Sequence, residues 1–382
     1  FKKNLSKAVE DYSLKVTDEN RLKGLKPPTI AAAKQLAIEK GEPNAWYFTI
    51  QATNVTGVLE YADDRTLREE IWRAFSARAS SAPYDNRPVA IEIAQLRQQK
   101  AQILGYETHA HLTTESRMAQ NPDTVFAFIN RLKSYYRPAA ERDLNELREF
   151  AASRGLKDLK PWDTAYYSQL LQTEKYSYDS DALKAYFPYE AVMNGALRTA
   201  ERLFKIKFIE RKDLKVWEPS VRAYEVVDSK GHHVAYYYND PYARKGKRAG
   251  AWMTTLQDAG FMSGRLKRPH VVNVLNLAPP VDGKPSLLSI DEVRTIFHEL
   301  GHGLHGMLTK VKNRTISGTS VAWDFVELPS QLNELWAIDP DNMQTFAHHF
   351  ETGEVIPREL IEKVRKSDHF QIGMFGLGQL RL

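Results

Sequence analysis

Hydrophobic positions over most of the chain recur every three to four residues, which predicts a mainly α-helical protein. In the segment 65–79, the apolar side chains Leu67, Ile71 and Phe75 would share one helix face. Further segments carry the same pattern, and we expect helices over 89–104, 122–132, 139–152 and 189–204. Gly105 is a typical residue for a helix C-terminus. Polar and proline-rich stretches predict loops between residues 79 and 89 and over 155–163.

The pattern changes near Phe208, where short β-branched and aromatic segments begin. Segments 221–228 and 234–239 flank a polar turn and predict a β-hairpin, and 270–277 predicts a further strand. Helical spacing resumes at Ile290 and continues to the end of the chain. We therefore expect a small sheet within a mainly α protein. A helical region over 1–207 would precede a region over 208–382 that holds the sheet and the chemistry.

Composition narrows the class of protein. The chain has 382 residues, of which 42% are hydrophobic, and this is typical of a soluble globular protein. It contains no apolar run long enough to span a membrane. The net charge is +5, and Lys and Arg are interleaved with Asp and Glu, so no nucleic-acid-binding stripe is expected. The local basic cluster of Arg244, Lys245, Lys247 and Arg248 is a candidate for contacting an anionic ligand group and is otherwise a loop.

The absence of cysteine limits the available chemistry. Thiol nucleophiles are excluded, and any metal ion must be held by His, Asp or Glu.

The segment around residue 298 combines a helix start with a metal-binding pattern. Ser289 and Glu292 form a capping-box signature, so a helix should begin there. His298 and His302 are four residues apart, which places both imidazoles on one helix face within reach of a single ion. Glu299 lies beside the first His, where it can polarise a metal-bound water. Zinc suits this set, because it accepts imidazole and carboxylate ligands and leaves a position open for water.

A catalytic zinc site needs a third protein ligand. One class of enzymes supplies a third His six residues after the second, but Leu308 occupies that position here. The alternative is a carboxylate from a second helix predicted over 324–336, which offers Asp324, Glu327 and Glu334. His305, three residues past His302, is expected to be packed or hydrogen-bonded rather than a ligand.

Three glycines within the predicted metal-binding helix suggest close packing. Gly301, Gly303 and Gly306 would each cost about 1 kcal/mol relative to Ala in a helix. We expect another backbone to approach this helix closely, as a helix that carries the third ligand would.

Several segments resemble the thimet oligopeptidase family of zinc metallopeptidases, which includes neurolysin. The most specific are FHELGHGLHG over 297–306, SGTS over 317–320 and DFVELPSQ over 324–331. Weaker matches occur at 161–167, 186–188 and 246–253, so the resemblance covers the chain from about residue 84 onward. Within the family, the chain looks most similar to the bacterial peptidyl-dipeptidases, and an oligopeptidase A-like protein is the alternative.

The resemblance implies a specific site and fold. His298, His302 and Glu327 would hold one Zn²⁺ ion, and Glu299 would be the general base. The family fold is mainly α, with two lobes that flank a deep channel and a small sheet near the zinc. Only short peptides enter this channel, and the sheet offers an edge along which they can lie.

The resemblance also implies an activity, which is the release of C-terminal dipeptides from short peptides. Cleavage at internal bonds is the alternative. A monomer is expected, and the cytoplasm is favoured over the periplasm. The family carries a His and Tyr loop downstream of the zinc helices, whereas this sequence starts at Phe1 and stops at Leu382 before such a loop, so we expect that segments are missing at both ends. Two rival hypotheses are a catalytically incomplete zinc-binding chain and a metal-dependent hydrolase of non-peptides.

Overall fold

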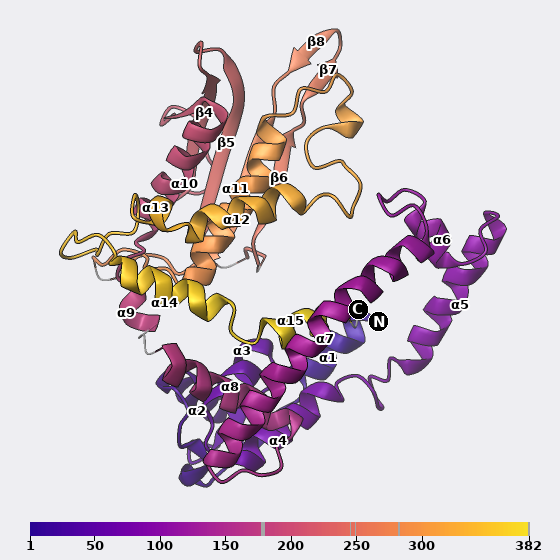
Figure 1. Cartoon of the computed structure of the whole chain (residues 1–382), viewed down its shortest axis with the longest axis vertical. Coiled ribbons are helices and arrows are strands. Elements are labelled where there is room, and N and C mark those ends of the chain that lie inside the picture. The colour runs from indigo at the N-terminus through magenta and orange to yellow at the C-terminus, as the bar shows by residue number, and fades with distance from the viewer. Residues whose placement is uncertain (177–179, 245, 249, 282, 381–382) are drawn as a thin grey trace. The chain divides into compact units, whose positions relative to one another are not determined.

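The computed structural model describes residues 1–176, 180–244, 246–248, 250–281 and 283–380. The chain forms two compact units (Figure 1). Unit 1 comprises Phe1–Glu115, Ala119–Ser177 and Ser367–Leu382, and unit 2 comprises Ser116–Met118 and Tyr178–Lys366. The division predicted from the sequence, between a helical region over 1–207 and a catalytic region over 208–382, concerns function and stays a prediction.

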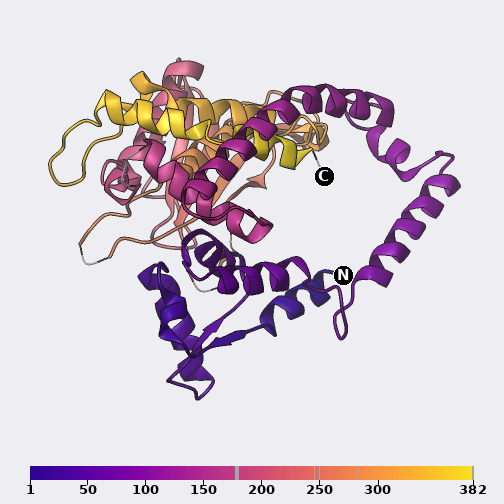
Figure 2. The same ribbon diagram turned by 60° about the horizontal axis from the view of Figure 1, so that its bottom comes forward.

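Unit 1 is almost entirely helical. Its helices are α1 Lys2–Glu10, α2 Pro27–Glu39, α3 Ala52–Tyr61, α4 Arg65–Ser76, α5 Arg87–Ile103, α6 His109–Thr114, α7 Pro122–Ser153, α8 Pro161–Tyr176 and α15 Ile372–Gln379, with a short 3-10 helix at Glu19–Leu22. Strands β1 Leu14–Val16 and β2 Trp46–Phe48 form an antiparallel pair. Figure 2 shows α5, α6 and α7 following one another in purple.

Helix α4 illustrates how the sequence positions these elements. Asp64 caps its N-terminus by accepting hydrogen bonds from two backbone amides, those of Thr66 and Leu67. Leu67 and Ile71 are fully buried on one helix face, as their spacing predicted. On another face, Arg68 donates to the buried carboxylate of Asp163 in α8 at 2.9 Å. Both the apolar face and this ion pair therefore attach α4 to its neighbours.

The helices predicted over 122–132 and 139–152 are one continuous helix, α7, so the predicted break was wrong. Pro138 lies inside it and removes one backbone hydrogen bond. Contacts with α15 support the helix at this point. A Cβ on Gly373 would lie 2.4 Å from the backbone of Ala139, and one on Gly376 would lie 2.2 Å from the ring of Tyr136. Helix α7 is therefore packed closely against α15 on the turn that contains the proline.

Unit 2 is built around a five-stranded sheet in the order β3-β4-β5-β9-β6. Its strands are β3 Ile206–Glu210, β4 Arg222–Asp228, β5 His233–Tyr242, β6 Trp252–Gln257 and β9 His270–Leu277, and β7 Gly260–Met262 with β8 Arg265–Lys267 forms a separate hairpin. Its helices are α9 Ser180–Lys184, α10 Tyr189–Phe204, α11 Ile290–Met307, α12 Leu328–Ile338, α13 Pro340–Met343 and α14 Arg358–Asp368, whose last residues belong to unit 1, with a 3-10 helix at Arg314–Ile316.

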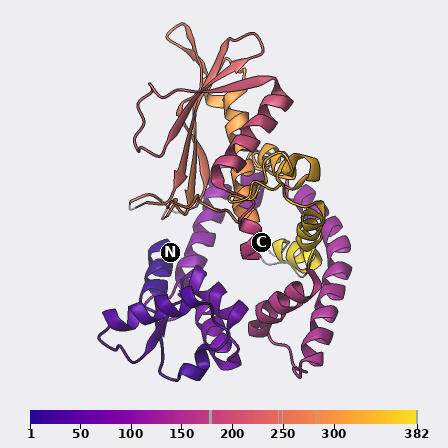
Figure 3. The same ribbon diagram turned by 90° about the vertical axis from the view of Figure 1, so that its left-hand side faces the viewer.

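The predicted hairpin is formed by the antiparallel strands β4 and β5, and the predicted strand over 270–277 is β9. Strand β9 pairs in parallel with β5 and antiparallel with β6, which is the edge strand next to it. Helices α10 and α11 lie on the same side of this sheet (Figure 3). They pack on one sheet face through buried residues such as Tyr237, Val271 and Phe297.

The protein is mainly α with a small mixed sheet, as the sequence predicted. Helices resume at Ile290 as predicted, and α11 and α12 are separated by a largely irregular segment over 308–327. The predicted helix over 324–336 begins later, at Leu328. Among the described residues, no helix combines the length and apolar character needed to cross a bilayer.

Candidate metal centre

Helix α11 carries the central pair of histidines. It begins at the predicted capping box, where the Ser289 side chain accepts from the Glu292 amide and the Glu292 carboxylate accepts from the Ser289 amide. Val293, Ile296 and Leu300 fix the helix on the core. This anchoring leaves the face that carries the two histidines turned toward α12.

His298, His302 and Glu327 lie together. Their candidate ligand atoms are all within 4.8 Å of one another. A single carboxylate oxygen of Glu327 lies 3.3 Å from Nε2 of His298 and 3.1 Å from Nε2 of His302. The imidazole centroids are 4.8 Å apart, with the rings almost perpendicular. The structure therefore brings together all three predicted ligands, from two different helices.

Glu327 is held at the start of α12. It is the N-cap residue of that helix, and its side chain is 52% exposed. The hydroxyl of Ser330, which is fully buried, donates to a Glu327 carboxylate oxygen at 2.8 Å. Ser330 is thus a positioning residue that the sequence reasoning missed. A serine three residues after a candidate carboxylate at a helix start was the available signal.

The other two carboxylates on this segment have different places. Asp324 accepts a hydrogen bond from the backbone amide of Met118 at 3.0 Å. Glu334, two turns along α12 from Glu327, lies 2.7 Å from Nδ1 of His298. Because an ionised carboxylate only accepts, this contact places the ring proton on Nδ1 and leaves the Nε2 lone pair directed to the candidate site. A carboxylate behind a ligating histidine is typical of metal sites.

The residues present fit a zinc ion. Two imidazoles and one carboxylate form a known donor set for catalytic zinc. All three groups converge on one point, and His298 is already in the tautomer that a metal requires. A cavity of about 410 Å³ beside His298 and Glu299 leaves space next to the candidate metal position.

Glu299 is buried beside this site, with 5% of its surface exposed. One of its carboxylate oxygens has no hydrogen-bond partner among the described residues. Burial, together with the negative charge of Glu327, raises the pKa of Glu299 to about 7, although His298 opposes the shift. A carboxylate with a pKa near neutrality can both accept and return a proton, which is what a general base requires.

The three glycines of α11 contact different neighbours. A Cβ on Gly301 would lie 2.7 Å from Cα of Ser330 in α12, so the predicted close approach of a second helix occurs here. On Gly303 and Gly306, a Cβ would instead meet side chains of the sheet, those of Asn273 and Met253. The helix is therefore pressed between α12 and the sheet.

Asn333 makes a further contact between the two helices that the sequence did not indicate. Its side-chain amide donates to the backbone carbonyl of Phe297 at 2.6 Å. Phe297 directly precedes His298. The hydrogen bond thus fixes the distance between α11 and α12 next to the first candidate ligand.

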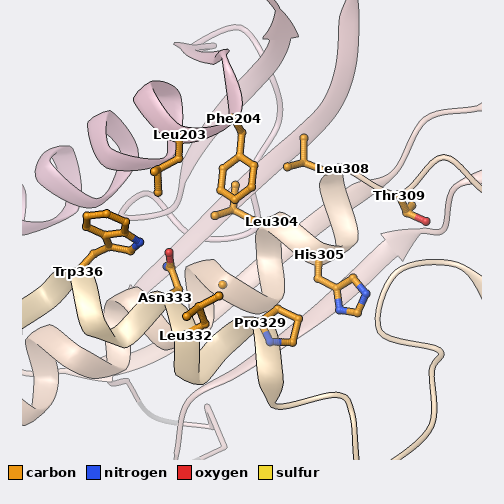
Figure 4. Close-up of a pocket in the computed structure, with 11 residues that line it drawn as sticks. Leu203, Phe204, Leu304, His305, Leu308, Thr309, Pro329, Leu332, Asn333 and Trp336 are labelled. Atoms are coloured by element: carbon orange, nitrogen blue, oxygen red, sulfur yellow. The ribbon is translucent and has the colours of Figure 1, made fainter.

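His305 lies outside the candidate ligand set, as expected. It contacts the ring of Phe325 and lines a cavity of about 410 Å³ with apolar residues that include Leu304 and Trp336 (Figure 4). Burial lowers the pKa of His305. Of the two expected roles, packed or hydrogen-bonded, the contacts show packing, and Nδ1 has no hydrogen-bond partner among the described residues.

Two members of the basic cluster are already paired within the chain. Arg244 and Lys247 both contact the buried carboxylate of Asp240, at 2.6 and 2.9 Å. Despite its burial, these contacts and a hydrogen bond from Trp217 lower the pKa of Asp240 to about 2. Arg248 is exposed and Lys245 lies outside the described residues. The structure thus gives Arg244 and Lys247 a structural role.

Comparison with known proteins places the chain among peptidases. The model of peptidase family M3 matches residues 58–382. Oligopeptidase A of Salmonella typhimurium is 40% identical over 100% of this chain and 57% of its own length. Dipeptidyl carboxypeptidase of Escherichia coli is 35% identical over 98% of this chain and 55% of its own length. Saccharolysin of Saccharomyces cerevisiae is 31% identical over 100% and 55%. The chain therefore spans little more than half the length of the curated relatives it matches.

Proposed function

Because the chain belongs to peptidase family M3, we propose that it is a zinc-dependent peptidase that hydrolyses short peptides. In this proposal His298, His302 and Glu327 hold the zinc and Glu299 is the general base. The observation that carries it is the convergence of these three side chains from two helices, with the buried carboxylate of Glu299 on the same helix as the histidines.

The chemistry follows from the placement of the side chains. Bound zinc would supply a Lewis acid that polarises the scissile carbonyl and makes water acidic enough to ionise near pH 7. Glu299 takes the proton from the attacking water and returns it to the leaving amine. Glu334 keeps the His298 ring oriented, and Ser330 keeps the Glu327 carboxylate oriented.

The edge of the sheet is the proposed place for substrate. Strand β6 pairs with β9 and is the last strand in the order of the sheet. An extended peptide can add to such an edge through main-chain hydrogen bonds, which requires no particular side chains. Met253 of β6 lies against Gly306 of the metal-binding helix, so this edge strand and α11 are neighbours.

Release of C-terminal dipeptides is the mode predicted from the sequence, and we retain it as the first hypothesis. Cleavage of internal bonds is the second. We keep both modes because the chain is similar to relatives with both kinds of name: oligopeptidase A is 40% identical to the chain and dipeptidyl carboxypeptidase is 35% identical. The pairing of Arg244 and Lys247 with Asp240 weakens them as candidates for binding the C-terminal carboxylate of a peptide.

Product analysis tests the activity and its mode together. The zinc-loaded chain is incubated with a peptide of about ten residues, with either a free or an amidated C-terminus, and the products are identified by mass spectrometry. Successive loss of dipeptides from the free form alone supports the first mode, and internal cleavage of both forms supports the second. No cleavage of either peptide by the fully zinc-loaded chain would refute the proposed activity.

Variants separate the metal site from the base. Glu299→Gln should retain zinc and lose hydrolysis, because the amide cannot accept the proton. His302→Gln should lose zinc, whereas the matched change His305→Gln, one turn further along the same helix, should keep it. Zinc is measured by elemental analysis, and normal hydrolysis by Glu299→Gln would contradict the base assignment.

A further inference from the structure

Two segments of unit 2 carry cationic residues but no acidic residue. Residues 259–281 carry Arg265, Lys267 and Arg268, and residues 300–323 carry Lys310, Lys312 and Arg314, with no Asp or Glu in either segment. Together the two segments contribute +6 to the formal charge.

The two segments form one surface. The backbone amide of Phe261 in β7 donates to the carbonyl of Lys312 at 3.0 Å, and the Ala259 amide donates to the Ser317 hydroxyl at 3.2 Å. Gly260 lies so close to the second segment that a Cβ there would be 2.9 Å from the Arg314 amide nitrogen. The β7–β8 hairpin and the segment after α11 are therefore held together, and we call their charged surface the basic pole.

Most cations of the basic pole are exposed and uncompensated. Arg314 pairs with Asp258 at 3.0 Å. The other five side chains are exposed and form no ion pair with the described residues: Arg265, Lys267, Arg268, Lys310 and Lys312. Such a cluster attracts anionic groups over roughly a Debye length, about 10 Å at 0.1 M salt.

The basic pole adjoins the proposed peptide-binding edge. Strand β6 ends at Gln257 and the chain enters β7 at Gly260. A cavity of about 180 Å³ is lined by Thr255 of β6, Gly306 of α11 and Gly318 of the segment that belongs to the pole. A peptide that lies along β6 and continues past Gln257 would therefore reach the pole.

We propose that the basic pole selects peptides that carry acidic side chains, by attracting their carboxylates as the peptide lies along β6. This inference rests on the proposed peptidase function and specifies its substrate class. Continuity of the pole with the β6 edge favours an acidic peptide over other polyanions. Anionic vesicles and oligonucleotides are tested as rival occupants.

The first test measures binding without hydrolysis. Zinc-loaded Glu299→Gln chain is titrated with two fluorescent peptides that differ only in having Glu and Asp or their amides Gln and Asn. We expect the acidic peptide to bind at least about tenfold more tightly at low salt, within the range that electrostatic attraction provides. The difference should shrink strongly at about 0.5 M salt, where screening is nearly complete. Equal affinities at low salt would overturn the proposal.

The second test localises the effect. The triple variant Arg265→Glu, Lys267→Glu and Arg268→Glu should abolish the preference for the acidic peptide. A control of the same charge change in unit 1 replaces Lys2, Lys3 and Lys7, all exposed on α1, by Glu and should retain it. Equal loss in both variants would mean that net charge alone is responsible, and the proposal would fail.

Other outcomes separate this inference from the proposed function. Selective binding of the acidic peptide by a chain that hydrolyses nothing would support the pole and refute the peptidase proposal. Hydrolysis of both peptides without any preference would support the peptidase proposal and refute the role of the basic pole. Binding of anionic vesicles or an oligonucleotide through the pole, with no discrimination between the peptides, would also overturn the inference.

Discussion

At the scale of single residues, Glu334 is the side chain whose importance is most easily overlooked. It is not among the candidate ligands, yet it fixes the tautomer and the orientation of His298. The Glu334 carboxylate should strengthen metal binding in two ways. It orients the His298 ring, and its negative charge raises the basicity of that imidazole.

We expect Glu334→Gln to lower zinc affinity by about 10- to 100-fold, which is the usual effect of removing such a partner. Competition with a zinc-binding dye measures this affinity directly. Glu362→Gln provides a control on α14, where the carboxylate pairs, among the described residues, with the exposed Arg365. An affinity in Glu334→Gln equal to that of the control would mean that the contact with His298 has no effect on metal binding.

At the scale of elements, the packing of α11 against α12 decides where Glu327 lies. Gly301 permits this approach, because any side chain there would overlap the backbone of Ser330 and Pro329. The two helices can separate only by moving Glu327 away from His298 and His302. Helix packing and ligand geometry are therefore coupled.

Gly301→Ala should consequently destabilise the chain by about 1–3 kcal/mol, as overpacking of a buried contact does, and should weaken zinc binding as well. Gly378→Ala is the matched control, because that glycine lies exposed in helix α15 and a new Cβ would have no atom of the described residues within 4 Å. There the better helix propensity of Ala should add up to about 1 kcal/mol. Urea unfolding gives both values, and a stabilising Gly301→Ala would contradict the described packing.

Some elements could be predicted from sequence and others could not, for physical reasons. Helix α10 and strand β9 were predicted with their observed bounds, because their apolar residues face one core. The continuity of α7 through Pro138 was missed, since it depends on contacts with α15 more than two hundred residues away. Strand β6 was missed because its sequence, WMTTLQ, does not alternate between apolar and polar residues, and its apolar Leu256 faces solvent at the sheet edge.

The site shows the same division. His298, Glu299 and His302 are neighbours on one helix, so local spacing was enough to group them. Glu327 belongs to another helix, and the residues alone left it open against Asp324 and Glu334; only the family resemblance selected it. The family itself is confirmed by the match over residues 58–382. The contacts of Ser330, Asn333 and Glu334 required the packed structure.

At the scale of the whole molecule, the chain has two compact units, and all the candidate metal ligands lie in the same one. His298, His302 and Glu327 all lie in unit 2. Metal binding adds its free energy to the stability of the part that holds the ligands. The two units should therefore respond differently to removal of the metal.

We expect a chelator to lower hydrogen-exchange protection in α11 and α12 while leaving α4 and α8 of unit 1 unchanged. Exchange measured by mass spectrometry, with peptides assigned to each helix, resolves the two units. The Glu327→Ala chain should show the same pattern without a chelator. Equal loss of protection in both units would indicate that they unfold as a single cooperative body.

All the candidate ligands lie within the single span 298–327. Bringing together groups this close along the chain costs little loop-closure entropy, since that cost rises with the logarithm of loop length. Strand pairings of the sheet beside it span similar or shorter separations, such as Tyr236 with His270 in β5–β9 and Gln257 with His270 in β6–β9. A bound ion would join the two ends of the 298–327 loop as a cross-link does, and would thereby remove most of the entropy that this loop gains on unfolding.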